Sequence, residues 1–236
     1  MVEETMFDAE RDLIREGFNK YTRRAFHALP KLDKPRILDV GCGSGVPTME
    51  LARLSDGEIV GLDVDRHAIA VLRRKVEEAG LADRVTIVER SMLDMDFPDE
   101  SFDIIWSEGS IFVVGFEKGL KAWGRLFKPN GFLAVHDEMG NIDEKLAQIS
   151  DCGYELVEYF MLDEDVWWNE YYAPLERWIS EIGTEYKDDS GALAVLEKDQ
   201  REIDMFKSNP GRFKSVFFVM RKKESDSEGC INRTIT

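Results

Sequence analysis

The sequence predicts an α/β fold with a mainly parallel sheet. Up to about Asp143, short apolar runs alternate with segments of helical periodicity, which is the order of strand–helix–strand units. The runs are continuously apolar, as is typical of strands that helices cover on both faces. Right-handed crossovers then bring the carboxyl ends of the parallel strands to one edge, where ligands bind in such folds.

Five apolar runs are predicted strands in the first part of the chain, and two more follow. They are residues 37–40, 58–62, 84–88, 102–106, 132–135, 154–162 and 213–220. The helices between them follow from apolar residues at three- and four-residue spacing. Pro47 suits the first turn of one helix, Asp65 suits the N-cap of the next, and Gly80 suits its end.

Two segments outside this alternation are also expected to be helical. Residues 8–29 have helical periodicity and would form most of an N-terminal cap over residues 1–30. Residues 163–211 are rich in aromatic residues and too long for a hairpin loop, so we predict a helical insert or lid. The polar tail 225–236 is expected to be mobile, which leaves residues 1–224 as one domain.

Composition argues against several classes of protein. The 236 residues carry a net charge of −16, so the surface repels a phosphate backbone on average and nucleic acid is not an expected partner. No apolar run has membrane-spanning length, and the N-terminus does not resemble a signal peptide. Cys42, Cys152 and Cys230 lack metal-ligand spacing and suit reduced thiols. We therefore expect a cytoplasmic protein without a membrane partner, and a homodimer is left open.

A glycine-rich loop organises the predicted ligand edge. Gly41, Gly43 and Gly45 follow the first strand at alternate positions and precede a helix. Glycine permits a sharp turn and the close approach of a ligand, and the helix N-terminus offers free N–H groups. A dinucleotide site requires G-x-G-x-x-G, whereas Val46 stands three positions after Gly43. Asp63, after the second strand, could accept both hydroxyls of a ribose, which fits any adenosine-containing ligand.

Taken together, the motifs resemble those of class I S-adenosylmethionine-dependent methyltransferases. They are Asp39–Gly45, Gly61–Asp65, Ser91–Ile105 and Leu126–Leu133, in the order and spacing of that family. The resemblance implies a Rossmann-like sheet of seven strands in the order 3-2-1-4-5-7-6, with strand 7 antiparallel and helices on both faces. It also implies S-adenosylmethionine as the cofactor.

The resemblance assigns roles at the donor site. Asp39 would orient the glycine loop and the donor's amino group, Asp63 would hold the ribose, and Met92 would form a wall for the adenine. Ser91 stands where the family often has an acidic residue, and its hydroxyl can still accept a bond from the adenine amine. The expected cofactor-binding residues are Asp39, Gly41, Cys42, Gly43, Asp63, Val64, Ser91, Met92 and Ser107.

Each of these features also has a plainer structural interpretation. The three glycines could form only a tight turn between a strand and a helix. Asp63 could cap a helix, although Asp65 is better placed to do so. Cys42 could be a small residue that the loop tolerates.

Methyl transfer mainly requires orientation of the acceptor and exclusion of water, and it requires a base only where the acceptor must lose a proton. Glu108, after the fourth strand, is the first candidate catalytic residue, and a role as a brace of the loop is equally open. The run His136–Glu138 is a second candidate group. It resembles a metal cluster only superficially, because the other strand ends supply no matching ligands, and no metal is predicted.

The aromatic residues of the insert could form a wall for an apolar or quaternary-ammonium acceptor. Trp168, Tyr172 and Leu175 share one helical stripe and are predicted core residues. Trp167 and Tyr171 lie off that stripe, and Tyr171 is the second candidate catalytic residue. The expected acceptor-binding residues are Tyr21, Glu108, Ile111, Trp167 and Tyr171.

These observations favour a methyltransferase that acts on a small-molecule acceptor by in-line displacement. A protein or RNA methyltransferase is the first alternative, weakened by the lack of a basic face and of an Asn/Asp-Pro-Pro-Tyr tetrapeptide after the fourth strand. A nicotinamide-dependent oxidoreductase is disfavoured by the missing third glycine. A non-catalytic protein that binds S-adenosylmethionine stays open.

Overall fold

The computed structural model describes residues 2–186 and 188–223, and their side chains from residue 7 onward. The predicted mobile tail, with Cys230, lies outside the described residues. Among the described helices, none combines the length and the apolar character needed to cross a membrane.

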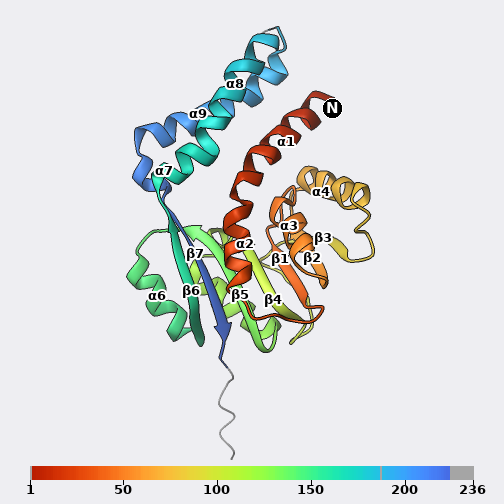
Figure 1. Cartoon of the computed structure of the whole chain (residues 1–236), viewed down its shortest axis with the longest axis vertical. Coiled ribbons are helices and arrows are strands. Elements are labelled where there is room, and N and C mark those ends of the chain that lie inside the picture. Colours follow the sequence, from red (N-terminus) through yellow and green to blue (C-terminus); the bar gives the residue numbers. More distant parts are fainter. Residues whose placement is uncertain (1, 187, 224–236) are drawn as a thin grey trace, which may run out of the picture.

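A seven-stranded sheet forms the centre of the fold, in the order β3-β2-β1-β4-β5-β7-β6 (Figure 1). Pairing is parallel from β3 to β5, and β7 runs antiparallel to both of its neighbours. This is the predicted order, so the fold class is confirmed. The strands are β1 Arg36–Val40, β2 Glu58–Asp63, β3 Val85–Glu89, β4 Phe102–Glu108, β5 Phe127–Glu138, β6 Tyr154–Leu162 and β7 Ser215–Lys222.

Helices cover both faces of the sheet, each over its own core. One face packs against α2 Asn19–His27, α3 Val46–Leu54 and α4 Arg66–Glu78, and the other against α5 Phe116–Trp123 and α6 Ile142–Asp151. Successive strand residues alternate between the two cores, so Ile104 and Trp106 lie in the first and Ile105 in the second. Residues that follow Trp106 and Ala134 at even spacing therefore face the α2 side of the sheet.

The predicted N-terminal helix is interrupted. It consists of α1 Val2–Arg15, a 3-10 turn Glu16–Phe18, and α2. Gly17 lies in that turn, where the main chain passes close to the insert: a Cβ at Gly17 would lie 3.4 Å from the carbonyl oxygen of Glu170. The interruption lets α2 follow the sheet while α1 rises above its carboxyl edge (Figure 1).

The segment between β6 and β7 is helical and has a small core of its own. It contains α7 Glu164–Trp167, a π-helical turn Trp168–Tyr172, α8 Ala173–Glu185 and α9 Ser190–Ser208. These helices rise from the sheet beside α1 (Figure 1), and the ring of Phe7 lies 5.6 Å from that of Trp178. The core residues of the segment are Tyr171, Tyr172, Leu175, Ile203 and Phe206.

Candidate active site

The glycine loop joins β1 to α3 in a left-handed conformation that favours glycine. The φ angles of Gly41, Gly43 and Gly45 are 74°, 52° and 84°. A Cβ on Gly45 would lie 2.1 Å from Cδ1 of Leu72, and one on Gly41 would lie 2.4 Å from Cβ of Ser110. Nothing lies within 4 Å of the Cβ position on Gly43. The first and third glycines are therefore required by packing, whereas Gly43 borders open space.

Asp63, at the end of β2, holds this loop through backbone N–H groups. Its Oδ2 accepts from the Gly43 N–H at 2.8 Å, and its Oδ1 accepts from the next two N–H groups at 2.7 and 3.0 Å. A carboxylate has about four lone-pair sites, so these three bonds leave about one, on Oδ2, for a ribose hydroxyl. Asp65, and not Asp63, caps α4.

Asp39, in β1, connects this strand to the helix that follows the loop. The side chain is buried and accepts a hydrogen bond from Oγ1 of Thr48 at 2.6 Å. Burial raises the pKa of Asp39 to about 7. The bond fixes the first turn of α3 to β1, and no side chain caps the N-terminus of α3. Its first free N–H groups are therefore available to a ligand.

Three further predicted donor residues follow strands at the same edge. Val64 is 63% exposed. Cε of Met92 lies 3.4 Å from the Cβ position of Gly41, so this side chain covers the start of the loop. Oγ of Ser91 accepts from the backbone N–H of Leu93 at 3.2 Å.

The side chains of two other predicted donor residues point into the interior. Cys42 is buried, and its sulfur lies 3.2 Å from the Cβ position of Gly61 in β2. Ser107 is also buried, and its hydroxyl shares a hydrogen bond of 2.7 Å with that of Ser110, which donates to the carbonyl of Val40. Any contact of Cys42 or Ser107 with a donor must therefore come from main-chain atoms.

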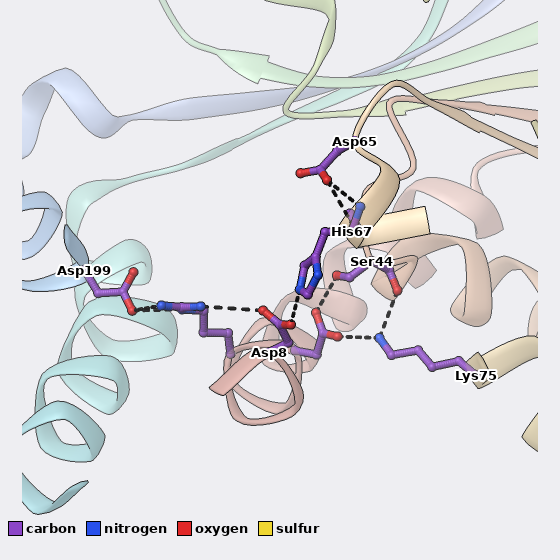
Figure 2. Close-up of polar contacts among 9 residues, drawn as sticks. Asp8, Ser44, Asp65, His67, Lys75 and Asp199 are labelled. Atoms are coloured by element: carbon purple, nitrogen blue, oxygen red, sulfur yellow. Dashed lines mark hydrogen bonds and ion pairs between the residues drawn. The ribbon is translucent and has the colours of Figure 1, made fainter. Parts of the chain in front are cut away.

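Helix α1 lies against the glycine loop and is tied to it by polar contacts (Figure 2). Asp12 accepts from Oγ of Ser44 at 2.5 Å and from Nζ of Lys75 at 2.6 Å. Lys75 also donates to the carbonyl of Ser44 at 3.0 Å. One turn earlier, Asp8 lies 2.6 Å from Nε2 of His67 at the start of α4.

The same helix contacts the insert. Arg11 donates to Oδ2 of Asp199 in α9 through Nε and Nη2, at 2.8 and 2.5 Å (Figure 2). Sequence reasoning missed these contacts because charged residues on a helix usually face water. The feature of the sequence that could have indicated these contacts is a polar stripe at helical spacing, formed by Asp8, Asp12, Arg15 and Asn19.

A small enclosed cavity lies beside the loop, and its volume is about 30 Å³. That is roughly the space of one water molecule, so any acceptor larger than this requires the cavity to open. Its walls come from the N-terminal helices, α3, the ends of β4 and β5, and the insert. The lining residues are Arg15, Phe18, Asn19, Val46, Pro47, Glu108, His136, Trp167 and Tyr171.

Glu108 makes the bracing contacts that were considered for it. Its Oε1 accepts from Oγ1 of Thr22 and from Nε1 of Trp106, both at 2.8 Å, so it braces α2 against β4. No described residue donates to Oε2, which is left for a ligand in the cavity. Burial raises the pKa of Glu108, while these two hydrogen bonds and the charge of Arg15 oppose the rise.

His136, at the end of β5, is held as a neutral imidazole. Its Nε2 lies 2.7 Å from Oγ of Ser215, and Nε1 of Trp167 donates to the same oxygen at 3.0 Å. Among the described residues Nε2 is the acceptor that the serine proton can reach, because the indole only donates, and this assigns the imidazole proton to Nδ1. Burial lowers the pKa of His136 to about 3, and its ring stacks 4.4 Å from that of Phe217.

The neighbouring acidic residue does not make His136 part of a metal centre. Asp137 accepts from Nζ of Lys145 at 2.6 Å. Among the residues that the structure describes, no group of three or more His, Cys, Asp or Glu side chains could hold a metal ion.

Two predicted acceptor residues do not line the cavity. Ile111 is fully buried, because it begins a 3-10 turn that directs its side chain under α5: a Cβ on Gly119 would lie 2.8 Å from its Cγ1. Tyr21 is turned toward β6, where its ring lies 6.5 Å from that of Phe160 and below Nζ of Lys20 at 5.1 Å.

The other two aromatic candidates do reach the cavity. Trp167 and Tyr171 line it, whereas Trp168 and Tyr172 pack on Phe206 at ring distances of 5.9 and 4.4 Å. Tyr171 also packs in the core of the insert, so it belongs to both the cavity wall and that core.

Comparison with known proteins identifies the family. Residues 37–131 match the model of the methyltransferase domain. Methyltransferase GfsG of Streptomyces halstedii is 31% identical over 136 residues, which are 56% of this chain and 49% of that protein. Residues 37–131 form a methyltransferase domain, in a sheet with the strand order of class I S-adenosylmethionine-dependent methyltransferases.

Solved structures share the fold of this methyltransferase chain. A methyltransferase from Geobacter sulfurreducens, in complex with S-adenosyl-L-homocysteine, has a TM-score of 0.68 and 21% identity, covering 85% of this chain and 90% of that one. The (4+2)-cyclase SpnF has a TM-score of 0.70 and 20% identity, covering 87% of this chain and 80% of that one. At such identities the likeness shows the fold alone. The chain spans about half the length of GfsG, 49%, so family membership does not name its acceptor.

Proposed function

We propose that the protein transfers a methyl group from S-adenosylmethionine to a small-molecule acceptor by in-line displacement. The observation that carries the proposal is the pairing of open space at Gly43 with the Asp63 carboxylate, which holds the loop and keeps one lone pair for a ribose hydroxyl. The cavity beside the loop lies between the N-terminal helices and the insert, which supports an acceptor small enough to be enclosed between them.

The residues present fit this donor. Asp63 would hold the ribose, Val64 and Met92 would contact the adenine, and Gly43 would lie under the methionine part, close to the uncapped N-terminus of α3. When bound, S-adenosylmethionine supplies an electrophilic methyl group on a sulfonium sulfur.

The chain's own contribution on the acceptor side is orientation, exclusion of water and acceptance of a proton. Oε2 of Glu108 would accept a hydrogen bond from an amine or hydroxyl of the acceptor and take the proton that this group loses as it gains the methyl group. The raised pKa of Glu108 makes the carboxylate a stronger base than an exposed one. Trp167, Tyr171 and the N-terminal helices would keep water away.

A second candidate function is a reaction other than methyl transfer on the same scaffold. The likeness to a cyclase supports keeping it in view, because a shared fold does not fix the chemistry. The two are separated by whether radioactivity from a labelled methyl group appears in the acceptor.

Donor binding is tested by calorimetry with S-adenosyl-L-homocysteine. Asp63→Ala is expected to weaken binding by at least about tenfold, because hydrogen bonds to a charged group are lost together with the anchor of the loop. Asp65→Ala is the matched control, since it removes only the cap of α4 and leaves affinity within about twofold. Binding of NADH without binding of S-adenosyl-L-homocysteine would refute the proposal.

The role of Glu108 is tested by Glu108→Gln with the best acceptor from a panel of amines and hydroxy compounds. Glutamine keeps an Oε1 for Thr22 and Trp106, so the brace survives while the base is lost. Turnover is expected to fall by roughly 10²–10⁴ with the affinity for S-adenosyl-L-homocysteine unchanged. Unchanged turnover would show that Glu108 is only a brace.

A further inference from the structure

Arg15, in the last turn of α1, forms no ion pair with the described residues, and its charge acts on the carboxylate of Glu108 in the same cavity. Its guanidinium lies 5.9 Å from the ring centre of Tyr171 and lines the cavity. Arg11 pairs with Asp199, and Lys20 pairs with Glu170 at 2.5 Å. Arg15 makes no ion pair or side-chain hydrogen bond with the described residues, although its neighbours on both sides are paired.

His136 offers a second donor in the same cavity. Its Nε2 is occupied by Ser215, and the Nδ1–H has no acceptor among the residues that the structure describes. The ring and Arg15 are close enough for the guanidinium charge to disfavour protonation of His136. A guanidinium and a neutral N–H donor that face one cavity are the groups that proteins use for an oxyanion.

The position of His136 in the sheet separates this residue from the glycine loop that would hold the methyl donor. In the strand order, β4 stands between β5, which carries His136, and β1, which leads into the glycine loop. Neighbouring strands lie about 4.8 Å apart, so β5 is roughly 10 Å from β1. Trp167, which fixes Ser215 and thereby His136, belongs to the insert. His136 therefore lies on the acceptor side of the loop, and Arg15 lines the same cavity.

We propose that Arg15 and His136 form an oxyanion subsite, so that the acceptor carries a carboxylate or phosphate at one end and its amine or hydroxyl at Glu108. This assignment rests on the proposed function of the same cavity. The aromatic side chains of Phe18, Trp167 and Tyr171 would contact the body of the acceptor between these ends.

The test uses the full chain saturated with S-adenosyl-L-homocysteine and measures binding of benzoate, phenyl phosphate and benzamide by calorimetry. Benzamide has the shape of benzoate without its charge. Wild type is expected to bind benzoate or phenyl phosphate at least about tenfold more tightly than benzamide, as charge-assisted hydrogen bonds imply. The preferred anion distinguishes a carboxylate from a phosphate acceptor.

Variants then show which residues cause the preference for an anion over benzamide. Arg15→Gln should abolish it, Arg15→Lys should keep part of it, and His136→Asn should reduce it. Arg73→Gln, an exposed arginine on α4, is the control and should keep the full preference. Because Arg15 is itself exposed, its replacement should not affect folding.

Three results would overturn the subsite. They are equal binding of benzamide and both anions to wild type, an anion preference that survives Arg15→Gln, and a loss of affinity in Arg15→Gln for S-adenosyl-L-homocysteine but not for methylthioadenosine. The last would assign Arg15 to the donor's own carboxylate. Failure of wild type to bind S-adenosyl-L-homocysteine at all would instead refute the proposed function.

Discussion

Gly43 and Gly45 share a left-handed conformation but have different surroundings. Gly45→Ala would place a Cβ 2.1 Å from Leu72, so we expect it to lower the free energy of unfolding by roughly 2–4 kcal/mol, from overpacking and backbone strain together. Gly43→Ala meets no atom within 4 Å and should cost only about 1–2 kcal/mol of strain. Its Cβ would instead occupy the donor's space and weaken binding of S-adenosyl-L-homocysteine.

Urea denaturation and calorimetry on the two variants check this pair. Gly45→Ala should be the less stable protein, and Gly43→Ala should be the weaker binder at a temperature where both are folded. Equal stability of the two variants would contradict the packing argument, and unchanged donor affinity in Gly43→Ala would contradict the assignment of the open space.

At this scale, the sequence was informative where a role follows from local chemistry. Asp65 caps α4 because it directly precedes the helix, whereas Asp63 precedes it by three positions and turns to the loop instead. The positions of Ile111 and Tyr21 could not be predicted in the same way. Each depends on the rotation of a short turn or helix against a distant element, which spacing along the chain does not encode.

Helix α1 connects two elements that the sequence keeps far apart. It contacts the glycine loop through Asp12 and the insert through Arg11 and Asp199, whose positions differ by 188. A pairing at such separation has no local signal, so the sequence could predict an N-terminal helix but not what it covers. The strands were predictable because their continuous apolar character reports burial on both faces.

We therefore expect α1 and the insert to move as one lid. Arg11→Glu should weaken the docking of α1 by about 1–2 kcal/mol, because the pair with Asp199 is half-buried and one partner would be left facing a like charge. The measurement is hydrogen exchange of the α1 amides, which should become faster. The double variant Arg11→Asp and Asp199→Arg should restore slow exchange, and no restoration would mean that the ion pair does not hold the helix.

Across the whole molecule, the pH dependence of stability combines opposing effects, and the buried groups Asp39 and His136 contribute effects of opposite sign. The pKa of Asp39 is raised to about 7, so the folded protein keeps a proton that the unfolded chain has lost between about pH 4 and 7, and stability falls as pH rises. The pKa of His136 is lowered to about 3, so the unfolded chain holds the extra proton between about pH 3 and 6.5, and stability rises with pH. Between about pH 4 and 6.5 the two effects offset each other.

Removing either group should reveal the effect of the other on the pH dependence of stability. Asp39→Asn keeps an acceptor for Thr48 and removes the first effect, so its stability relative to wild type should increase by roughly 1.4 kcal/mol for each pH unit between pH 4 and 6.5. His136→Asn should show the opposite trend over the same range, because it removes the effect that rises with pH. Urea denaturation at pH 4.5 and pH 6.5 measures both. If the three proteins changed in parallel, neither buried group would be titrating between its folded and unfolded states, and a cavity with a neutral His136 would lose its basis.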